Sequence, residues 1–329
     1  MSNMLSQLKG QSFNGIAAKL TILLLLVGLV PALVVFGVFK WSEAALKKDT
    51  EHNLENLAVH IGQTIDRNLF ERYGDVQAFG LNVAAFDQAN WNSNDPANPL
   101  VHAMDGYMTG YGIYRLMLLL DLSGKVVAVN SVDAKGKPIG TSQLLGANFA
   151  GEEWFAAAAQ GRFLEGRNGL TGTAVAEAQF SPVVAKLYGD DGFVLPFSAP
   201  VKDAAGKAVA VWVNFADFGL VEEIYGEIYA EMEKEGRAHA ELTLLDKSGR
   251  VLVDYDPHGQ KSKEYRRNPN IIGKFNLAEK LEVAKRAVAG ETGVEAALQA
   301  RKNVWQEAAF AHTRGAYDYP GLGWSVLVR

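Results

Sequence analysis

Residues 119–126 read LLDLSGKV, and residues 244–251 read LLDKSGRV. Each stretch is an apolar run, a turn of the form Asp-x-Ser-Gly and a second apolar run, which together predict a β-hairpin. The order of the next elements also repeats, because each copy leads to a Leu-Gly or Ile-Gly pair, a helical stretch and a further glycine. A repeated order of elements predicts two related lobes in tandem.

Both lobes are predicted to contain antiparallel sheets, which makes the fold class α+β. Residues 220–235 carry apolar side chains at helical spacing and are interpreted as a helix that connects the lobes. The first lobe then covers residues 91–219, and the second covers residues 220–329 together with the connecting helix. The strands that close the two sheets are predicted at residues 192–198, 208–215, 305–312 and 324–328.

Residues 41–90 are predicted to form one long helix. They contain no proline, and their apolar residues recur every three or four positions, as on one face of a helix. A helix of this length exceeds what one small lobe can bury, so it either transmits a displacement along its axis or is only a stalk. The residues of this series are Leu54, Leu57, Ile61, Ile65, Leu69, Tyr73, Val76, Phe79, Val83 and Phe86.

Residues 20–39 contain no charged side chain. At helical rise such a run spans about 30 Å, the thickness of a bilayer's hydrocarbon core, which predicts a transmembrane helix at residues 20–40. A cleaved signal peptide is the alternative, but its apolar region is only about 7–15 residues long. Residues 1–19 lack acidic side chains and are predicted to be a short cytoplasmic tail. The remainder would then be extracytoplasmic, and its lack of cysteine is compatible with a bacterial periplasm, with the apolar helix in the inner membrane.

The composition excludes several classes of function. The 329 residues include 32 Lys and Arg, 37 Asp and Glu and no Cys, which gives a net charge of −5. No polybasic surface is therefore predicted, and nucleic acid is not an expected partner. Without cysteine there can be no disulfide, no thiolate metal site and no thiol nucleophile.

The sequence contains no catalytic motif. The six histidines form neither an HxxxH nor an HExxH pattern, and neither a GxSxG elbow nor a phosphate-binding GxxxxGK loop is present. Asp254, Asp256 and His258 lie close together in the chain, but the stretch DPHG is interpreted as a turn. We therefore expect no enzyme activity, no metal site and no cofactor.

Taken in order, several of these features resemble the double Cache sensor domain of bacterial methyl-accepting chemotaxis proteins. They are the apolar helix with its VGLVP segment, the long helix, the Asp-x-Ser-Gly hairpin, the Trp154-Phe155 pair and the stretch FSAPV at residues 197–201. The resemblance covers about residues 16–329. It implies a periplasmic sensor with PAS-like membrane-distal and membrane-proximal lobes, followed by a second membrane helix, a HAMP linker and a cytoplasmic signalling domain. The sequence ends at Arg329 without a second hydrophobic run, so we expect the sensor half of a longer protein.

The resemblance also implies a ligand site in the membrane-distal lobe, enclosed by the sheet and by the segment ahead of Trp154. Aromatic walls with a few polar groups suit a small, partly polar solute. Plain core packing is the alternative for each aromatic residue except Trp154. The candidate ligand-binding residues are Tyr111, Tyr114, Arg115, Trp154, Phe155, Tyr188, Asp191, Phe197, Asn214 and Asp217.

The residues near Trp154 argue against one class of ligand. Family receptors that bind amino acids carry an arginine two positions before this tryptophan and an aspartate near the end of the last distal strand. Glu152 and Asn214 occupy these positions here. A carboxylate would repel the anionic group that arginine binds, so we expect a small molecule other than an α-amino acid held in the usual way. For Glu152 the alternative is a solvated residue at the start of a helix.

The expected function is that of a chemotaxis receptor's sensor. Ligand binding in the distal lobe would shift the long helix, by no more than the difference in ligand affinity between two conformations allows. The long helix is expected to pair with its copy in a homodimer. The alternatives are the same module on a histidine kinase or a diguanylate cyclase, a membrane-anchored periplasmic enzyme, or a passive adhesion stalk.

Overall fold

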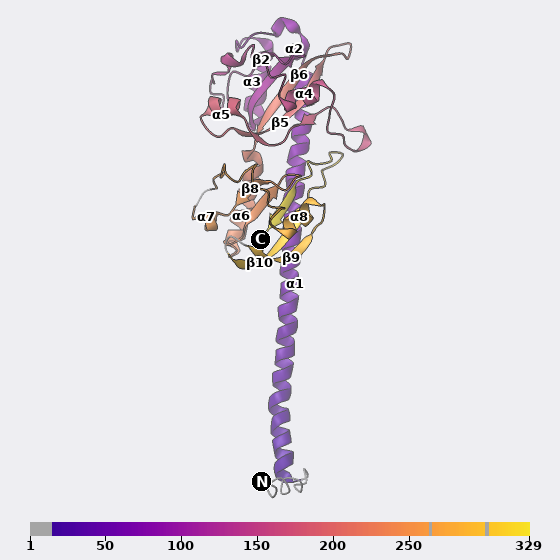
Figure 1. Cartoon of the computed structure of the whole chain (residues 1–329), viewed down its shortest axis with the longest axis vertical. Coiled ribbons are helices and arrows are strands. Elements are labelled where there is room, and N and C mark those ends of the chain that lie inside the picture. The colour runs from indigo at the N-terminus through magenta and orange to yellow at the C-terminus, as the bar shows by residue number, and fades with distance from the viewer. Residues whose placement is uncertain (1–14, 263–264, 300–302) are drawn as a thin grey trace. The chain divides into compact units, whose positions relative to one another are not determined.

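The computed structural model describes residues 15–262, 265–299 and 303–329 (Figure 1). The chain divides into two compact units, residues 1–53 and residues 54–329. Most of the predicted cytoplasmic tail, up to position 14, lies outside the described residues.

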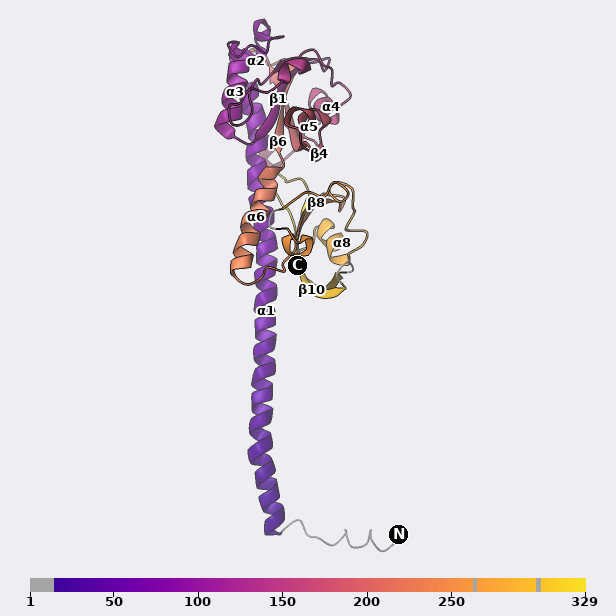
Figure 2. The same cartoon turned by 90° about the vertical axis from the view of Figure 1, so that its left-hand side faces the viewer.

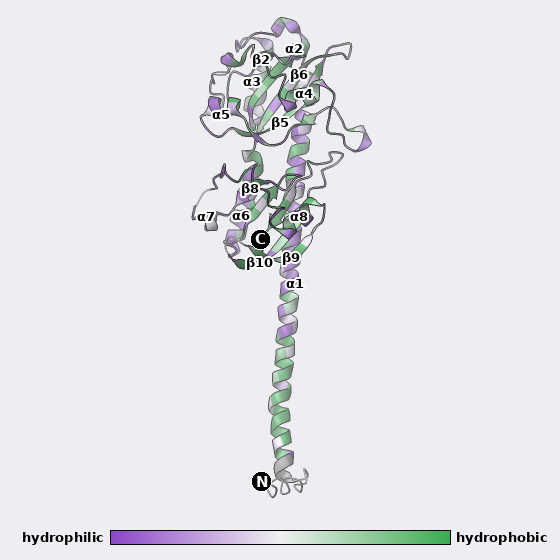
Figure 3. Ribbon diagram, in the orientation of Figure 1, coloured by the Kyte–Doolittle hydropathy of each residue, from purple (hydrophilic) through white to green (hydrophobic). Residues whose placement is uncertain are grey.

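The first unit contains the N-terminal part of the long helix α1 (Ile16–Gly80). Large apolar side chains between Leu20 and Phe39 are exposed, and Figure 3 shows this part of the helix as hydrophobic over most of its length. A helix that is apolar on every side is unfavourable in water, whereas lipid accommodates it. Within the described residues, α1 is the one helix that is long and apolar enough to cross a membrane.

The long helix ends earlier than the sequence predicted. α1 ends at Gly80, and the chain then enters α2 (Val83–Phe86) and the 3₁₀ turn η1 (Gln88–Asn90). Asn82 caps α2, because its Oδ1 accepts a hydrogen bond from Ala84 N at 2.9 Å. A capping asparagine favours the start of a new helix over continuation of the old one. The predicted helix over residues 41–90 is therefore wrong in its last ten residues.

The lobe that was predicted over residues 91–219 and to be membrane-distal, called the distal lobe from this point, is built on an antiparallel sheet. Its strand order is β2-β1-β6-β5-β3, and β4 also pairs with β5. One face packs against α1 and α3 (Pro99–Tyr111), and the other against α4 (Glu153–Ala159) and α5 (Pro182–Tyr188). The strands are β1 (Tyr114–Asp121), β2 (Val126–Val129), β3 (Ala174–Val175), β4 (Gln179–Phe180), β5 (Phe193–Lys202) and β6 (Ala208–Asp217).

The proximal lobe (residues 220–329) repeats this arrangement with the strand order β8-β7-β11-β10-β9. α6 (Gly219–Lys234) leads into it and runs beside α1 (Figure 2), while α7 (Pro257–Gln260) and α8 (Glu282–Val288) are short. In both sheets the hairpin is followed by the last and then the penultimate strand, so the predicted pair of related antiparallel lobes is confirmed. The strands are β7 (Leu242–Leu245), β8 (Val251–Tyr255), β9 (Gly293–Gln299), β10 (Val304–His312) and β11 (Ser325–Val328).

The repeated Asp-x-Ser-Gly turn has a physical cause in both lobes. The Oδ1 atoms of Asp121 and Asp246 each accept hydrogen bonds from the backbone N–H groups two and four residues later, at 2.8–3.1 Å. Gly124 and Gly249 have φ values of +84° and +89°, a backbone conformation that residues other than glycine rarely adopt. A Cβ atom on Gly124 would also lie 2.6 Å from the backbone of Ala150. The turn therefore requires both the aspartate and the glycine.

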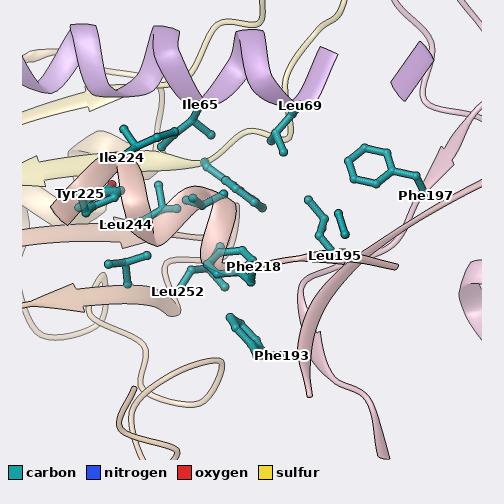
Figure 4. Packing of buried hydrophobic residues seen from close by; sticks show 14 of the residues in the cluster. Ile65, Leu69, Phe193, Leu195, Phe197, Phe218, Ile224, Tyr225, Leu244 and Leu252 are labelled. Carbon is teal, nitrogen blue, oxygen red and sulfur yellow. The ribbon is translucent and has the colours of Figure 1, made fainter. Parts of the chain in front are cut away.

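One large hydrophobic core joins α1 to both lobes (Figure 4). Ile65 and Leu69 of α1 point into it, Leu195 enters from the distal sheet, and Leu244 enters from the proximal sheet. Phe218, just before α6, packs where the two lobes meet. A second, separate core lies in the distal lobe under α4 and α5.

Candidate functional site

The strands of the distal sheet present alternate side chains to two different environments. On β1, Met117 and Leu119 belong to the core shared with α1, whereas Leu116 and Leu118 belong to the core under α4 and α5. This alternation is inherent to a β-strand, in which successive side chains point to opposite faces. A cavity under α4 and the long helix α1 therefore lie on opposite faces of one sheet.

A small cavity of about 40 Å³ lies on the α4 face of the distal sheet. Trp154 forms one wall and meets the ring of Phe215 edge-on, with 5.2 Å between ring centroids. Ser198 Oγ donates a hydrogen bond to Trp154 O at 2.5 Å, which fixes the start of α4 to the sheet. The remaining apolar lining comes from Leu116, Leu118, Phe149, Pro182 and Val183.

The polar lining of this cavity consists of Glu152, Gln179 and Ser181. Glu152 is exposed at the start of α4, makes no side-chain capping bond and forms no ion pair among the described residues. Ser181 Oγ accepts a hydrogen bond from Val184 N at 3.4 Å as the cap of α5. A carboxylate, a carboxamide and a hydroxyl together suit a ligand that donates hydrogen bonds or carries a positive charge.

Four of the predicted ligand residues lie on the face toward α1. Phe197 and Asn214 are partners in the register of β5 and β6, so both point away from the cavity. Tyr114 donates a hydrogen bond from its hydroxyl to Asp75 Oδ2 on α1 at 2.5 Å. Tyr111 packs edge-on against Phe79 of α1, with 5.0 Å between ring centroids.

Asn214 is fully buried beside Trp212 on this face. Its Oδ1 accepts a hydrogen bond from Trp212 Nε1 at 2.7 Å, and its Nδ2 has no hydrogen-bond partner among the described residues. Burial also raises the pKa of Tyr114, because ionising the phenol would place a charge in the core next to Asp75. Tyr114 therefore links the sheet to α1, and neither Tyr114 nor Asn214 lines the cavity at Trp154.

Four further predicted residues belong to or adjoin one cluster of charged side chains, and two of them, Asp191 and Asp217, contact Arg267 of the proximal lobe. The other two are Arg115 and Tyr188. Arg115 Nη2 lies 2.6 Å from Asp190 Oδ2, and Arg115 Nη1 lies 3.2 Å from Asp217 Oδ2. The Arg115 guanidinium stacks over the Tyr188 ring at 4.0 Å, and the Tyr188 hydroxyl donates to Arg115 O at 2.7 Å. Burial raises the pKa of Tyr188 to about 12.

Arg267 of the proximal lobe completes this interlobe ion cluster, defined as Arg115, Asp190, Asp191, Asp217, Glu222 and Arg267. Arg267 Nε lies 2.6 Å from Glu222 Oε1, and Arg267 Nη1 lies 2.6 Å from Asp191 Oδ1. The Glu222 side chain is 11% exposed, and burial raises its pKa although the arginine opposes the shift. Neither Arg267 nor Glu222 belongs to a sequence motif, so sequence reasoning missed both.

Trp154 is the one predicted residue that lines the distal cavity, and Phe155 packs in the core beside it. Phe149, Gln179, Ser181 and Phe215 were not predicted. Successive side chains of β1 and β6 alternate between the two faces of the sheet. Phe215 is the strand partner of Leu116 and shares its face, so this alternation could have identified Phe215.

The proximal lobe contains a larger cavity of about 330 Å³. Asp254 is one of its lining residues, but Asp256 and His258 are not. Asp256 instead caps α7, because its Oδ1 accepts a hydrogen bond from Gly259 N at 2.8 Å. In the part of the chain that the structure describes, no group of three or more His, Asp or Glu residues could hold a metal ion.

A scan against models of protein families finds no match, and a search of curated protein sequences finds none either. Solved structures with this fold do match. The ligand-binding domain of the Campylobacter jejuni chemoreceptor Tlp3, in complex with 4-methylisoleucine, is 13% identical, with a TM-score of 0.57 over 88% of this chain and 94% of that chain. The ligand-binding domain of the Pseudomonas aeruginosa amino-acid chemoreceptor PctC, in complex with GABA, is 18% identical, with a TM-score of 0.53 over 85% of this chain and 98% of that chain.

Two further structures extend the comparison. The extracellular domain of a protein described as a histidine kinase is 13% identical, with a TM-score of 0.53 over 87% of this chain and 95% of that chain. An extracellular ligand-binding receptor from Desulfohalobium retbaense matches 84% of this chain but only 40% of its own length, with 11% identity and a TM-score of 0.52. The chain therefore has the fold of these sensory domains, as the resemblance to double Cache sensors predicted.

Proposed function

We propose that the chain is the extracytoplasmic sensor of a membrane-anchored chemotaxis receptor, and that it binds a small molecule in the distal lobe. The observation that carries the proposal is the placement of the Trp154 cavity and of α1 on opposite faces of one sheet. The fold of sensory domains and the single described helix that is apolar enough to cross a membrane support it.

The lining of the distal cavity favours a small amine or another hydrogen-bond donor. Glu152 places a carboxylate at the cavity without a cationic partner among the described residues, so a ligand ammonium group would be attracted there. A cavity of about 40 Å³ holds little more than a water or two, so a ligand must displace α5 or the segment that carries Gln179. Binding would then change the packing of the sheet beneath.

The distal cavity and α1 are separated only by the distal sheet, to which β1 belongs. Leu116 and Leu118 of β1 line the cavity, while the same strand presents Tyr114 to α1, where its hydroxyl donates to Asp75. Arg72 Nε lies 2.8 Å from the same Asp75 Oδ2, which ties the contact to the helix. A ligand that prefers one packing of the sheet would shift α1 by an amount limited by its difference in affinity for the two states.

A thermal-shift screen of the full chain in lipid nanodiscs tests ligand binding, because a ligand that binds only the folded state raises its melting temperature. The panel consists of amines, organic acids, purines and amino acids, and we expect an amine to raise the melting temperature by about a few degrees. Glu152→Gln should abolish that rise. Glu153→Gln is the matched control, since Glu153 pairs with Arg162 and does not line the cavity. No response to any compound, or equal effects of the two substitutions, would contradict the proposal.

We also propose a homodimer along the exposed face of α1 in the sensor unit. The chain has no native cysteine, so introduced cysteines report on this face alone. His60→Cys and Arg67→Cys should form disulfide-linked dimers in membranes, whereas Lys207→Cys, in the exposed β5–β6 turn, should not. Equal cross-linking at all three positions would count against the pairing. The exposed positions of the face are Asn56, His60, Gln63, Arg67, Glu71, Gly74 and Ala78.

The likeness to the extracellular domain described as part of a histidine kinase supports a second output for the same sensor. The two outputs differ only in the cytoplasmic domain that would follow the sensor. The sequence of the output domain would distinguish them, because a kinase and a methyl-accepting signalling domain have unrelated sequences.

A further inference from the structure

We propose a second ligand site in the proximal lobe, which binds a small apolar monocarboxylate. The site does not depend on the distal cavity. Its volume of about 330 Å³ lies within the usual range of about 300–1,000 Å³ for ligand pockets, whereas the distal cavity measures about 40 Å³.

The proximal cavity occupies the place in the second lobe that the distal cavity occupies in the first. In the distal sheet, Leu116 of β1 and Phe215 of β6 are partners and both line the cavity. In the proximal sheet, Glu241 and Arg329 exchange two backbone hydrogen bonds, at 2.8 and 2.9 Å, at the corresponding point before β7 and after β11. An apolar pair in one lobe is thus replaced by a charged pair in the other.

The charged pair gives the proximal cavity a polar floor. Arg329 Nη2 donates a hydrogen bond to Thr243 Oγ1 at 2.8 Å and lies 3.2 Å from Glu241 Oε2. The Arg329 side chain is 7% exposed and the Glu241 side chain is 0% exposed. Because Glu241 balances the guanidinium charge, the floor offers polar atoms without attracting a second anion into the depth of the cavity. Asp254, another lining residue, would repel a buried carboxylate further.

The walls of the cavity are apolar. They include Val251, Ile271, Leu277 and Leu281. Phe275 and Leu298 also line it, and they are 41% and 42% exposed. A ligand with an apolar body would cover these exposed surfaces, which gives binding a hydrophobic driving force.

A positive charge at the exposed part of the cavity lining determines which head group the ligand carries. Lys280 lines the cavity, is exposed and forms no ion pair among the described residues. Its ammonium group therefore attracts an anionic group that remains close to solvent, while the buried Asp254 disfavours an anion further inside. A single carboxylate on a compact aliphatic or aromatic body satisfies both conditions.

Three probes with the same body test the site: phenylacetate, 2-phenylethanol and phenethylamine, titrated by calorimetry into the full chain in lipid nanodiscs. We expect phenylacetate to bind most tightly. Leu298→Trp should abolish its binding by filling the cavity from an exposed position, and Ile271→Trp is a second filling variant should the first fail to fold. Glu153→Gln, at an exposed position of the distal lobe that lines neither cavity, should leave phenylacetate binding unchanged. Absence of binding at millimolar concentrations, or binding that survives both filling substitutions, would overturn the proposal.

The head-group assignment has its own test. Lys280→Gln should weaken phenylacetate binding by about threefold, as expected for an exposed ion pair, and Lys280→Glu should reverse the preference toward phenethylamine. Lys274→Glu is the matched control, because Lys274 is exposed in the same loop and does not line the cavity. A preference that stays the same in Lys280→Glu, or that shifts equally in Lys274→Glu, would overturn the assignment. Loss of amine binding in Glu152→Gln concerns only the distal site, so the two proposals fail separately.

Discussion

The two lobes have the same order of strands and the same hairpin turn, yet their cavities differ about eightfold in volume, 40 Å³ against 330 Å³. The turn is fixed by backbone requirements at Asp121 and Gly124, and by the same requirements at Asp246 and Gly249. The cavities depend instead on side chains that the backbone leaves free to vary. The repeat therefore preserves topology, while the side chains on each sheet specialise.

Equivalent positions near the two cavities carry different side chains. The second residue of α4 is Trp154, which closes the distal cavity, and the second residue of α8 is Val283. The equivalent strand-paired positions are Leu116 and Phe215 in one lobe and the ion pair of Glu241 with Arg329 in the other. Trp154, Leu116 and Phe215 all line the small distal cavity, whereas of their three counterparts Arg329 lines the larger cavity and Val283 and Glu241 do not.

The greatest loss of stability is expected when Trp154 of α4 is replaced by valine, the residue at the equivalent position of α8. Trp154→Val should lower the free energy of unfolding by about 3 kcal/mol, because it removes a buried ring and leaves a void between α4 and the sheet. Urea denaturation of the full chain, followed by far-UV circular dichroism, measures it. Trp305→Val is the control and should have little effect, since Trp305 is 72% exposed. Equal losses in the two variants would mean that Trp154 does not support the distal core.

A somewhat smaller loss is expected when the lobes are uncoupled. Arg267→Ala should cost about 2–3 kcal/mol, because it leaves Glu222 mostly buried without its guanidinium partner. The double variant Arg267→Ala with Glu222→Gln should recover part of this loss, since the unpaired charge is then gone. The unfolding transitions of the two lobes, each followed with its own probe, should coincide less closely in Arg267→Ala than in the wild type. If the double variant is no better than the single one, the ion pair is not the source of the coupling.

The sequence predicted the elements whose cause is local. The two hairpins follow from Asp-x-Ser-Gly, and the strands predicted at 192–198 and 208–215 became β5 and β6 within a few residues. The end of the long helix was missed, because the apolar spacing continues through Val83 and Phe86 while Asn82 starts a new helix.

The site was predicted far less well than the fold. Phe197 and Asn214 face α1 because strand register, which the sequence pattern did not determine, assigns them to that side. Arg267 meets Glu222 across 45 positions of the chain, and no motif reports such a pairing. Arg329 and Thr243 line a cavity only because the second sheet brings their strands together.

The attachment of α1 to the proximal lobe depends on pH through Asp66. Asp66 on α1 is buried, its Oδ2 accepts a hydrogen bond from Gly315 N at 2.6 Å, and burial raises its pKa from 3.8 to about 6. The folded state therefore binds this proton more tightly than the unfolded state. Protonation of Asp66 therefore stabilises the folded state. This contribution grows as the pH falls from 7 toward 4 and is lost as the pH rises through about 6.

Asp66→Asn should accordingly raise the free energy of unfolding by about 2 kcal/mol at pH 7, where the wild-type carboxylate is ionised in the core. At pH 4 the two proteins should be nearly equal in stability. Melting temperatures of both proteins across this range measure the difference, in which the titration of all other groups cancels. A constant difference at every pH would show that the Asp66 carboxyl does not titrate in this range.

The mildest change concerns the polar floor of the proximal cavity. Thr243→Val keeps the shape of the side chain but removes the Oγ1 acceptor of the Arg329 hydrogen bond, and it should cost about 1 kcal/mol. Leu118→Val, at the corresponding position of the distal sheet, should cost a similar amount for a different reason, the loss of a buried methylene. Phenylacetate affinity should change in the first variant and not in the second. The reverse pattern would place the polar floor in the wrong lobe.

Coupling between the distal cavity and the long helix can be measured by hydrogen–deuterium exchange of the full chain, with and without an amine that raises its melting temperature. If the distal sheet links the two, the ligand should slow exchange in β1 and also in residues 54–80 of α1, on the opposite face. Slower exchange confined to α4 and α5, with α1 unchanged, would contradict the coupling.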